Sequence, residues 1–293
     1  MVVLSNDALT VQVAEHGAEL SSIVAKETGK EYLWQADPAF WKRHSPVLFP
    51  IVGAVWNNEM RVGESKYCLT QHGFARDALF TLVSHEPAEV WMSFSSCEDT
   101  LALYPFDFRL EIGYRLAETT VEVMWRVKNI SSGEELHFQI GAHPAFNYLD
   151  YNPEAQNQGY MRLAPAAADY VLSVIGEKGC LNRSDDTLHT GAGDIEITRN
   201  TFDADAIILE NSQVQEVTLL ARDKTPYLRV SFDAPLVGLW SPARGKYAPF
   251  VCIEPWYGRC DREHYTGQYA DKEWMQHLAP GADFSASYKI TLL

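Results

Sequence analysis

The sequence predicts an all-β protein folded as one large antiparallel β-sandwich. Three observations favour this class. Apolar residues recur at every second position in many short segments, clusters of turn-forming residues separate the segments, and long helical patterns do not alternate with them. Such an alternation would instead indicate a parallel α/β fold. The chain shows no composition break, linker or internal repeat, so we expect a single domain over residues 1–293.

The clearest strand pattern lies in residues 108–127. In Phe108–Leu116 all five alternate positions are apolar, whereas a helical spacing from Phe108 catches only two of four. A turn at 117–119 leads into Val121–Val127, where apolar residues again occupy every second position. Two alternating runs joined by a short turn predict a β-hairpin.

Further short strands are expected at Val90–Phe94, Glu134–Ile140, Glu216–Ala221, Tyr227–Phe232, Leu236–Trp240, Phe250–Ile253 and Phe284–Leu292. Turn clusters at 129–133, 221–226 and 241–245 separate several of them. Two segments have weak helical patterns, Pro38–His44 and Lys272–Leu278, the second following Asp271 as an N-cap. Residues 150–200, rich in Gly, Asn, Asp and Ala, are expected to form an irregular excursion within the same domain.

Composition narrows the class of partner. The net charge of −15 argues against nucleic acid, because binding there depends on neutralising phosphates. No apolar run approaches the ~20 residues of a membrane-spanning helix, and no signal-like segment opens the chain, so we expect a cytoplasmic protein. The five cysteines have no CxxC spacing, which disfavours a disulfide framework or a thiolate zinc site. Abundant aromatic residues suit either a β-rich core or a site where sugar rings lie on aromatic faces.

Three segments share a form, in which an extended run ends at a polar group among small or rigid residues. They are Gln71–Asp77 (QHGFARD), Gly141–Asn147 (GAHPAFN) and Cys252–Gly258 (CIEPWYG). Pro144 and Pro255 are expected to end the strands before them, because proline lacks the amide donor and restricts the preceding residue.

A carboxylate at the end of an apolar strand is partly desolvated, which raises its pKa and suits it to accept a proton near neutrality. Histidine titrates in that range and can donate one. Glu254 and His143 are therefore candidates for proton transfer, with His72 beside them. The alternatives from the residues alone are a packing role for His143 and an ion pair between Glu254 and either Arg259 or Arg76. His137, inside its alternating strand, is expected to have a packing role.

A metal centre is a further alternative, since two histidines and one glutamate form the ligand set of a catalytic zinc site. Such sites usually take two ligands from one short element, whereas His72, His143 and Glu254 are widely separated in the chain. This spacing favours a site without metal. The sequence has no Gly-x-Ser-x-Gly elbow, phosphate loop or dinucleotide fingerprint.

Four segments in this order resemble the aldose 1-epimerase (galactose mutarotase) family, and most of all its branch related to the lactose-operon X protein. They are Leu48–Gly53 (LFPIVG), Gln71–Asp77, Gly141–Phe146 and Phe250–Trp256. The resemblance implies a galactose mutarotase-like supersandwich and interconversion of the α and β anomers of a free sugar without a cofactor. The implied partner is a small-molecule sugar, bound by a monomer or homodimer.

The resemblance also implies roles for individual residues. Glu254 corresponds to the general base that takes the proton of the C1 hydroxyl, His143 to the general acid at the ring oxygen, and His72 to a group that positions the sugar. Arg76 resembles a substrate-side residue of this branch. The family's sugar-binding aspartate matches Asp205, with Asp203 fitting almost as well. Trp240 and Trp256 are expected to line the cleft.

One departure from the family pattern concerns substrate preference. Galactose mutarotases carry an Asn-Arg pair shortly after the early glycine, but here the stretch reads Asn57-Asn58-Glu59, without the arginine. A hexose-6-phosphate 1-epimerase is therefore an alternative, with Arg43, Arg76, Arg244 and Arg259 as candidates for a phosphate patch. A non-catalytic carbohydrate-binding protein is the alternative from another class.

Overall fold

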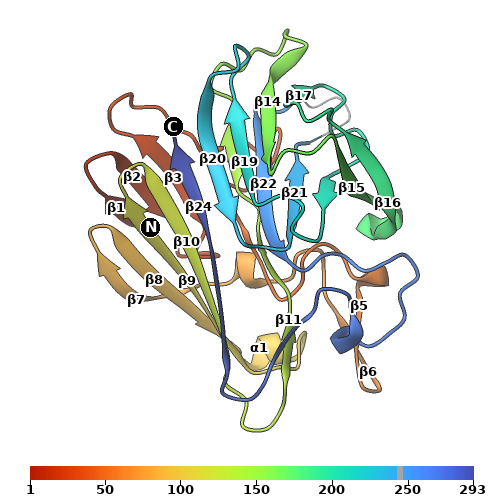
Figure 1. The fold of residues 1–293 in the computed structure, drawn as a ribbon. Coiled ribbons are helices and arrows are strands. Elements are labelled where there is room, and N and C mark those ends of the chain that lie inside the picture. Colours follow the sequence, from red (N-terminus) through yellow and green to blue (C-terminus); the bar gives the residue numbers. More distant parts are fainter. Residues whose placement is uncertain (243–246) are drawn as a thin grey trace.

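The fold is built almost entirely from antiparallel strands, as the alternating pattern predicts. We describe it from a computed structural model, which covers residues 1–242 and 247–293. Figure 1 shows the N-terminal strands and β7–β10 on one side of the molecule and the strands from β14 to β22 on the other. Among the described residues, no helix has the length and hydropathy needed to cross a membrane.

The larger sheet has nine strands. In spatial order they are β17 (Ile195–Thr198), β14 (Asn157–Ala164), β19 (Glu216–Leu220), β20 (Pro226–Phe232), β24 (Asp283–Leu292), β10 (Thr120–Asn129), β9 (Phe108–Ala117), β8 (Glu89–Ser95) and β7 (Thr81–Glu86). The expected hairpin is β9–β10, and its turn residue Glu118 has a positive φ of 52°. The alternate apolar positions of both strands are buried, as expected.

The second sheet carries the candidate site. Its order is β16 (Leu181–His189), β15 (Asp169–Ile175), β18 (Ile207–Leu209), β21 (Leu236–Trp240), β22 (Phe250–Tyr257), β12 (Ile140–Ala142) and β4 (Val47–Leu48), with β13 (Ala145–Asn147) also paired to β22. Val237, Leu239, Val251 and Ile253 face the core shared with the nine-stranded sheet. Because side chains alternate along a strand, Trp240, Cys252, Glu254 and Trp256 project from the opposite face.

Smaller elements complete the chain. They are the sheet β1 (Val2–Ser5), β2 (Leu9–Val13) and β3 (Leu20–Ala25), the hairpin β5 (Glu59–Val62) and β6 (Ser65–Cys68), the ribbon β11 (Leu136–Phe138) and β23 (Gln276–Leu278), the short helix α1 (Glu98–Leu101), and the 3-10 turns η1 (Trp56–Asn58), η2 (Ala75–Asp77), η3 (Glu177–Gly179) and η4 (Tyr269–Asp271).

Four sequence-based expectations were wrong. Pro38–His44 forms turns around Asp37 rather than a helix, and Lys272–Leu278 ends in strand β23. Residues 150–200 are not irregular, because they contain β14 to β17. Two of these strands, β16 and β17, are sheet edges, where exposed polar residues weaken the apolar alternation. Glu134–Ile140 is not one strand, since Gln139 separates β11 from β12.

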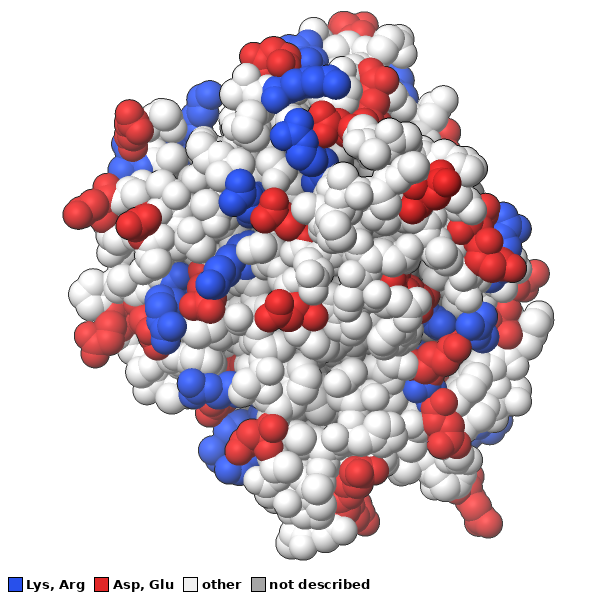
Figure 2. Space-filling view, in the orientation of Figure 1, with Lys and Arg blue, Asp and Glu red and all other residues white. Residues whose placement is uncertain are grey.

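Acidic and basic side chains are interspersed over the face seen in Figure 2, despite the net charge of −15. Of the predicted turn 241–245, Ser241 and Pro242 are described, whereas residues 243–245 lie outside the described ranges.

Candidate active site

His143 and Glu254 are brought together by the register of the second sheet. Strand β12 pairs with β22 through Gly141 and Trp256, and β13 pairs with the same strand through Ala145 and Cys252. His143 lies in the gap between these two ladders, and the common register places it opposite Glu254. Residues opposite each other on antiparallel strands project from the same face. The His143 Nδ1 atom accordingly lies 3.4 Å from Glu254 Oε1.

Pro255 lies inside β22 rather than after its end, which corrects the expectation that the strand stops at Glu254. Proline removes one amide donor from a ladder. On the β21 side Pro255 is paired with Val237, while on the other side it lies opposite the gap between β12 and β13. The strand therefore continues to Tyr257 and positions Trp256 as well as Glu254.

Glu254 is the most deeply buried carboxylate of the site. Its side chain is 2% exposed, and Oε2 has no hydrogen-bond partner among the described residues. Burial, and after it the negative charge of Asp205, holds the pKa of Glu254 well above its usual value. Loss of hydration disfavours the charged form of the carboxyl group. The carboxyl group is thus one that binds a proton readily near neutrality.

His143 is buried among aromatic rings. The Trp41 ring stacks on its imidazole with centroids 4.7 Å apart and planes 27° apart, and the Trp240 ring meets it edge-on at 5.5 Å. Burial, joined by the positive charges of Arg76 and Arg43, lowers the pKa of His143 to about 3. Trp41 was missed by the sequence analysis, because its segment carried only a weak helical pattern and none of the four recognised segments includes it.

His72 is fixed by a reciprocal pair of hydrogen bonds with Gly53. Its backbone amide donates to the Gly53 carbonyl at 2.9 Å, and its Nδ1 accepts from the Gly53 amide at 3.1 Å. The ring proton of neutral His72 is therefore on Nε2. Burial, followed by the charges of His143 and Arg76, lowers the pKa of His72 well below its usual value. His72 thus presents a neutral imidazole 5.6 Å from that of His143, measured between ring centroids.

Trp256 forms the floor of the site because two glycines make room for its ring. A Cβ atom at Gly238 would lie 2.5 Å from Trp256 Cη2, and one at Gly141 would lie 2.5 Å from Trp256 Cδ1. The indole Nε1 donates to the Ala142 carbonyl at 3.2 Å. The ring is thereby held flat over the two strands on either side of β22.

These side chains line one cavity of about 240 Å³. All seven residues predicted for the site contribute to it, namely His72, Arg76, His143, Asp205, Trp240, Glu254 and Trp256. Trp41 and Gln71 also line it. Of the two aspartates considered, Asp205 borders the cavity, in a loop where its φ is 80°, whereas Asp203 does not. A concave site with aromatic walls and a few converging polar groups is typical of a small-molecule site.

Arg76 is the cationic residue of this lining. Its Nη2 donates to the Gln71 carbonyl at 2.8 Å, and its Nε lies 3.8 Å from Asp77 Oδ2. Arg43 is nearby but forms an ion pair with Asp77 at 2.9 Å. The Asn57–Asn58 stretch, where the family arginine is absent, does not border the cavity. Arg244 lies outside the described residues.

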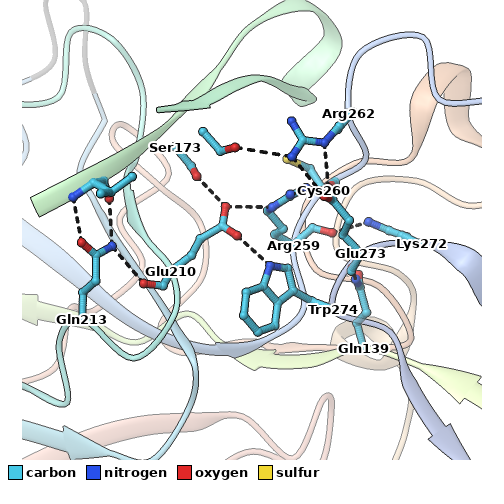
Figure 3. Close-up of polar contacts among 12 residues, drawn as sticks. Gln139, Ser173, Glu210, Gln213, Arg259, Cys260, Arg262, Lys272, Glu273 and Trp274 are labelled. Carbon is cyan, nitrogen blue, oxygen red and sulfur yellow. Dashed lines mark hydrogen bonds and ion pairs between the residues drawn. The ribbon is translucent and has the colours of Figure 1, made fainter. Parts of the chain in front are cut away.

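Arg259 belongs to a separate polar network, shown in Figure 3. Its Nε donates to Glu210 Oε1 at 2.9 Å, its Nη2 donates to Glu273, and its Nη1 donates to the Cys260 carbonyl at 3.1 Å. Trp274 Nε1 donates to the other Glu210 oxygen at 2.6 Å. Each guanidinium nitrogen of Arg259 thus donates to one of these partners, and Arg259 neither pairs with Glu254 nor lines the cavity. Its role is to hold the chain that follows β22.

The potential metal ligands near Glu254 differ from the set His72, His143 and Glu254 that the sequence suggested. His143, Cys252 and Glu254 offer atoms within 4.8 Å of one another, whereas His72 is not part of that cluster. The Nδ1 of His72 is engaged by Gly53. Burial raises the pKa of the Cys252 thiol, so Cys252 favours the protonated form, which is not the form that ligates metals.

The fold and this cavity define a β-sandwich protein with a small-molecule site, and comparisons with known proteins identify its family. Residues 1–290 match the aldose 1-epimerase family. The plasmid-encoded protein LacX of Lactococcus lactis subsp. lactis is 31% identical over 99% of this chain and 98% of its own length. The chain therefore belongs to the aldose 1-epimerase family.

Solved structures agree with this assignment. A galactose mutarotase related enzyme from Lactobacillus acidophilus superposes with a TM-score of 0.92 at 32% identity, covering 100% of this chain and 97% of that one. A galactose mutarotase-like protein from Lactobacillus casei gives 0.90 at 29% identity, with both chains fully covered. The expected mutarotase-like supersandwich is thus confirmed.

Proposed function

We propose that the protein is an aldose 1-epimerase, which interconverts the α and β anomers of a free hexose or a related sugar. The observation that carries the proposal is the His143–Glu254 pair at 3.4 Å, placed over an aromatic floor in the cavity. The C1 hydroxyl oxygen and the ring oxygen are bonded to the same carbon atom. An acid and a base that are close neighbours can therefore reach both atoms at once.

In the proposed reaction the Glu254 carboxylate takes the proton of the C1 hydroxyl while His143 gives a proton to the ring oxygen. The bond between C1 and the ring oxygen breaks, which yields the open-chain aldehyde. After rotation about the C1–C2 bond the two residues reverse their roles, and the ring closes with the opposite configuration at C1. Atoms and charge balance, because the residues exchange one proton each with the sugar in opposite directions.

The remaining lining residues bind and orient the sugar in this proposal. His72 donates from Nε2 near the ring oxygen, and Arg76 and Asp205 contact hydroxyl groups. Trp240 and Trp256 provide apolar faces for the sugar ring. Trp41 keeps the His143 imidazole in place by stacking. Positioning of this kind contributes to rate by orienting the reacting atoms.

The test is anomer exchange, measured by NMR exchange spectroscopy or polarimetry. We expect the wild-type protein to accelerate exchange of glucose or galactose. Glu254→Gln and His143→Gln are expected to lose about 10²–10⁴-fold in kcat, since each removes one proton-transfer group. His189→Gln is the matched control, because His189 is exposed, pairs with Asp169 and does not line the cavity, and this variant should retain activity.

Two outcomes would contradict the proposal. If wild-type protein and Glu254→Gln bind a sugar equally and neither accelerates exchange, the protein is a carbohydrate-binding protein without turnover. If chelation of metal ions abolishes exchange, the pair acts through a metal rather than by direct proton transfer.

A free sugar is favoured over a hexose 6-phosphate by the cationic groups of the described residues. Of Arg43, Arg76 and Arg259, Arg76 borders the cavity, Arg43 is paired with Asp77, and Arg259 with Glu210 and Glu273. We therefore expect kcat/KM for glucose to exceed that for glucose 6-phosphate. A preference for the phosphorylated sugar would reverse the substrate assignment while leaving the epimerase mechanism in place.

A further inference from the structure

The β11–β23 ribbon carries two histidines directly opposite each other. His137 of β11 is paired in register with His277 of β23, and Glu135 immediately precedes β11. These residues are separate from the cavity, because none of the three lines the cavity. β11 lies at the lower end of the molecule in Figure 1, next to α1. The sequence analysis gave His137 only a packing role.

The three side chains converge on one point. His137 Nδ1 lies 3.1 Å from His277 Nδ1, and Glu135 Oε2 lies 3.7 Å from His137 Nδ1 and 3.4 Å from His277 Nδ1. Ligand bonds of about 2.0–2.1 Å in a tetrahedral zinc site put neighbouring ligand atoms about 3.3–3.4 Å apart. The triangle made by these three atoms therefore has nearly the dimensions of one face of such a tetrahedron.

The position of His137 is fixed by its surroundings. Its imidazole meets the Phe106 ring edge-on at 5.4 Å, and its backbone carbonyl accepts a hydrogen bond from the Tyr104 hydroxyl. His277 and Glu135 are half-exposed, which leaves the fourth ligand position open to water.

We propose that Glu135, His137 and His277 form a binding site for a divalent transition-metal ion such as Zn²⁺. Two imidazole nitrogens and one carboxylate oxygen suit zinc, whereas calcium and magnesium prefer oxygen ligands throughout. A ligand from each strand, with a third beside them, would link β11 to β23. The site is therefore expected to stabilise this ribbon and to take no part in proton transfer to a sugar.

The test is zinc binding to the metal-free full-length protein. Isothermal titration calorimetry measures the binding, and thermal unfolding measures its effect on Tm. We expect one Zn²⁺ per chain at the ribbon and a rise in Tm of roughly 3–6 °C at saturating zinc. His277→Gln and His137→Gln should each weaken binding at least tenfold and abolish the rise. His277→Gln alters a half-exposed side chain, so the fold is expected to persist, which circular dichroism verifies.

Two control variants separate this site from other histidines. His189→Gln removes an exposed histidine that also pairs with a carboxylate, and should bind zinc like the wild type. His143→Gln removes a residue of the second candidate cluster, His143, Cys252 and Glu254, and should also retain ribbon binding. The proposal is overturned if zinc does not bind, if His277→Gln binds it unchanged, or if His143→Gln alone loses it.

This test is independent of the proposed epimerase activity. Zinc binding with no anomer exchange would leave the ribbon site in place and remove the enzymatic proposal. Anomer exchange without zinc binding would remove the ribbon site and leave the enzymatic proposal in place.

Discussion

In the proposed mechanism the buried His143–Glu254 pair carries one proton at a time. Burial lowers the pKa of His143 and raises that of Glu254, so in the free protein the proton lies on the carboxyl group. Moving it to the imidazole gives an ion pair with the same net charge. The proposed reaction starts from the ion pair and reaches the neutral form when the ring opens. The pair can therefore complete a cycle without exchanging a proton with the solvent.

This arrangement predicts the pH dependence of kcat/KM. The active pair holds one proton, so activity should fall on the acid side only when His143 takes up a second one, at about pH 3. On the alkaline side it should fall where the pair loses its proton, at the raised pKa of Glu254. Exchange rates corrected for the uncatalysed reaction between pH 4 and 10 measure the alkaline limit and show whether activity persists down to pH 4. An acid limb near pH 6.5 would contradict a His143 kept neutral by burial.

The seven residues that the sequence predicted for the site line one cavity, but the sequence did not point to Trp41, whose ring stacks on His143. Glu254 and His143 were recognisable because each follows an apolar run and precedes proline. Their proximity could not be predicted, because it depends on a register shared by two short strands and on Pro255 lying inside β22, opposite the gap between β12 and β13. Trp41 was missed because tertiary contacts, not any local pattern, bring its loop over His143.

At the scale of elements, the site depends on β21, β22 and β12 lying close enough for Trp256 to span them. Gly238 and Gly141 each lie against that ring, and neither has a backbone φ in the left-handed region that favours glycine. The requirement at both positions is therefore space. Glycine in a strand interior often marks such a close approach.

Gly238→Ala tests this requirement. The added methyl group would meet Trp256 Cη2 at 2.5 Å, so the ring must move. We expect a loss of about 1–3 kcal/mol in the free energy of unfolding, as for overpacked cores, together with a raised KM. Urea denaturation and anomer-exchange kinetics measure the two effects. Gly133→Ala is the matched control, because nothing lies within 4 Å of its new Cβ. Equal stability of the two variants would show that the ring is not constrained by Gly238.

At the scale of the whole molecule, the all-β class and most core strands followed from period-2 patterning alone. The secondary structure was predicted wrongly for segments that pack on one side only or not at all. Strand β16 exposes most of its residues, and β23 has only three residues. Patterns of this length do not distinguish an edge strand from a loop. The ribbon formed by β11 and β23 could not be predicted either, because both strands have only three residues.

The raised pKa of Glu254 is expected to make a contribution to the stability of the whole fold that depends on pH above 4.5. The pKa of Glu254 is raised in the folded state, so the folded protein holds a proton that the unfolded chain releases above its ordinary pKa of 4.5. The contribution of Glu254 to the free energy of unfolding should therefore fall as pH rises, by up to about 1.4 kcal/mol per pH unit until the folded pKa is reached. His143, whose folded pKa is lowered from 6.5 to about 3, contributes in the opposite direction below pH 6.5, so the decrease for the pair as a whole begins above that pH.

Glu254→Gln removes this linkage. We expect the variant to gain stability relative to the wild type between pH 5 and pH 7, while losing catalytic activity. Guanidinium denaturation at both values measures the difference. Parallel stability curves for the two proteins would show that the folded state binds no extra proton at Glu254.

The pairing of β12 and β13 with β22, interrupted opposite Pro255, holds one part of the site on paired strands and leaves the other part on loops and turns. The proposed proton-transfer partners are spaced by neighbouring strands of one sheet, whereas Trp41 and Asp205 lie on loops and Arg76 on the 3-10 turn η2. Loops tolerate insertions and replacements better than paired strands do. If the proposed function holds, replacements at the rim would change the sugar that is bound, while the spacing of His143 and Glu254 beneath it would stay the same.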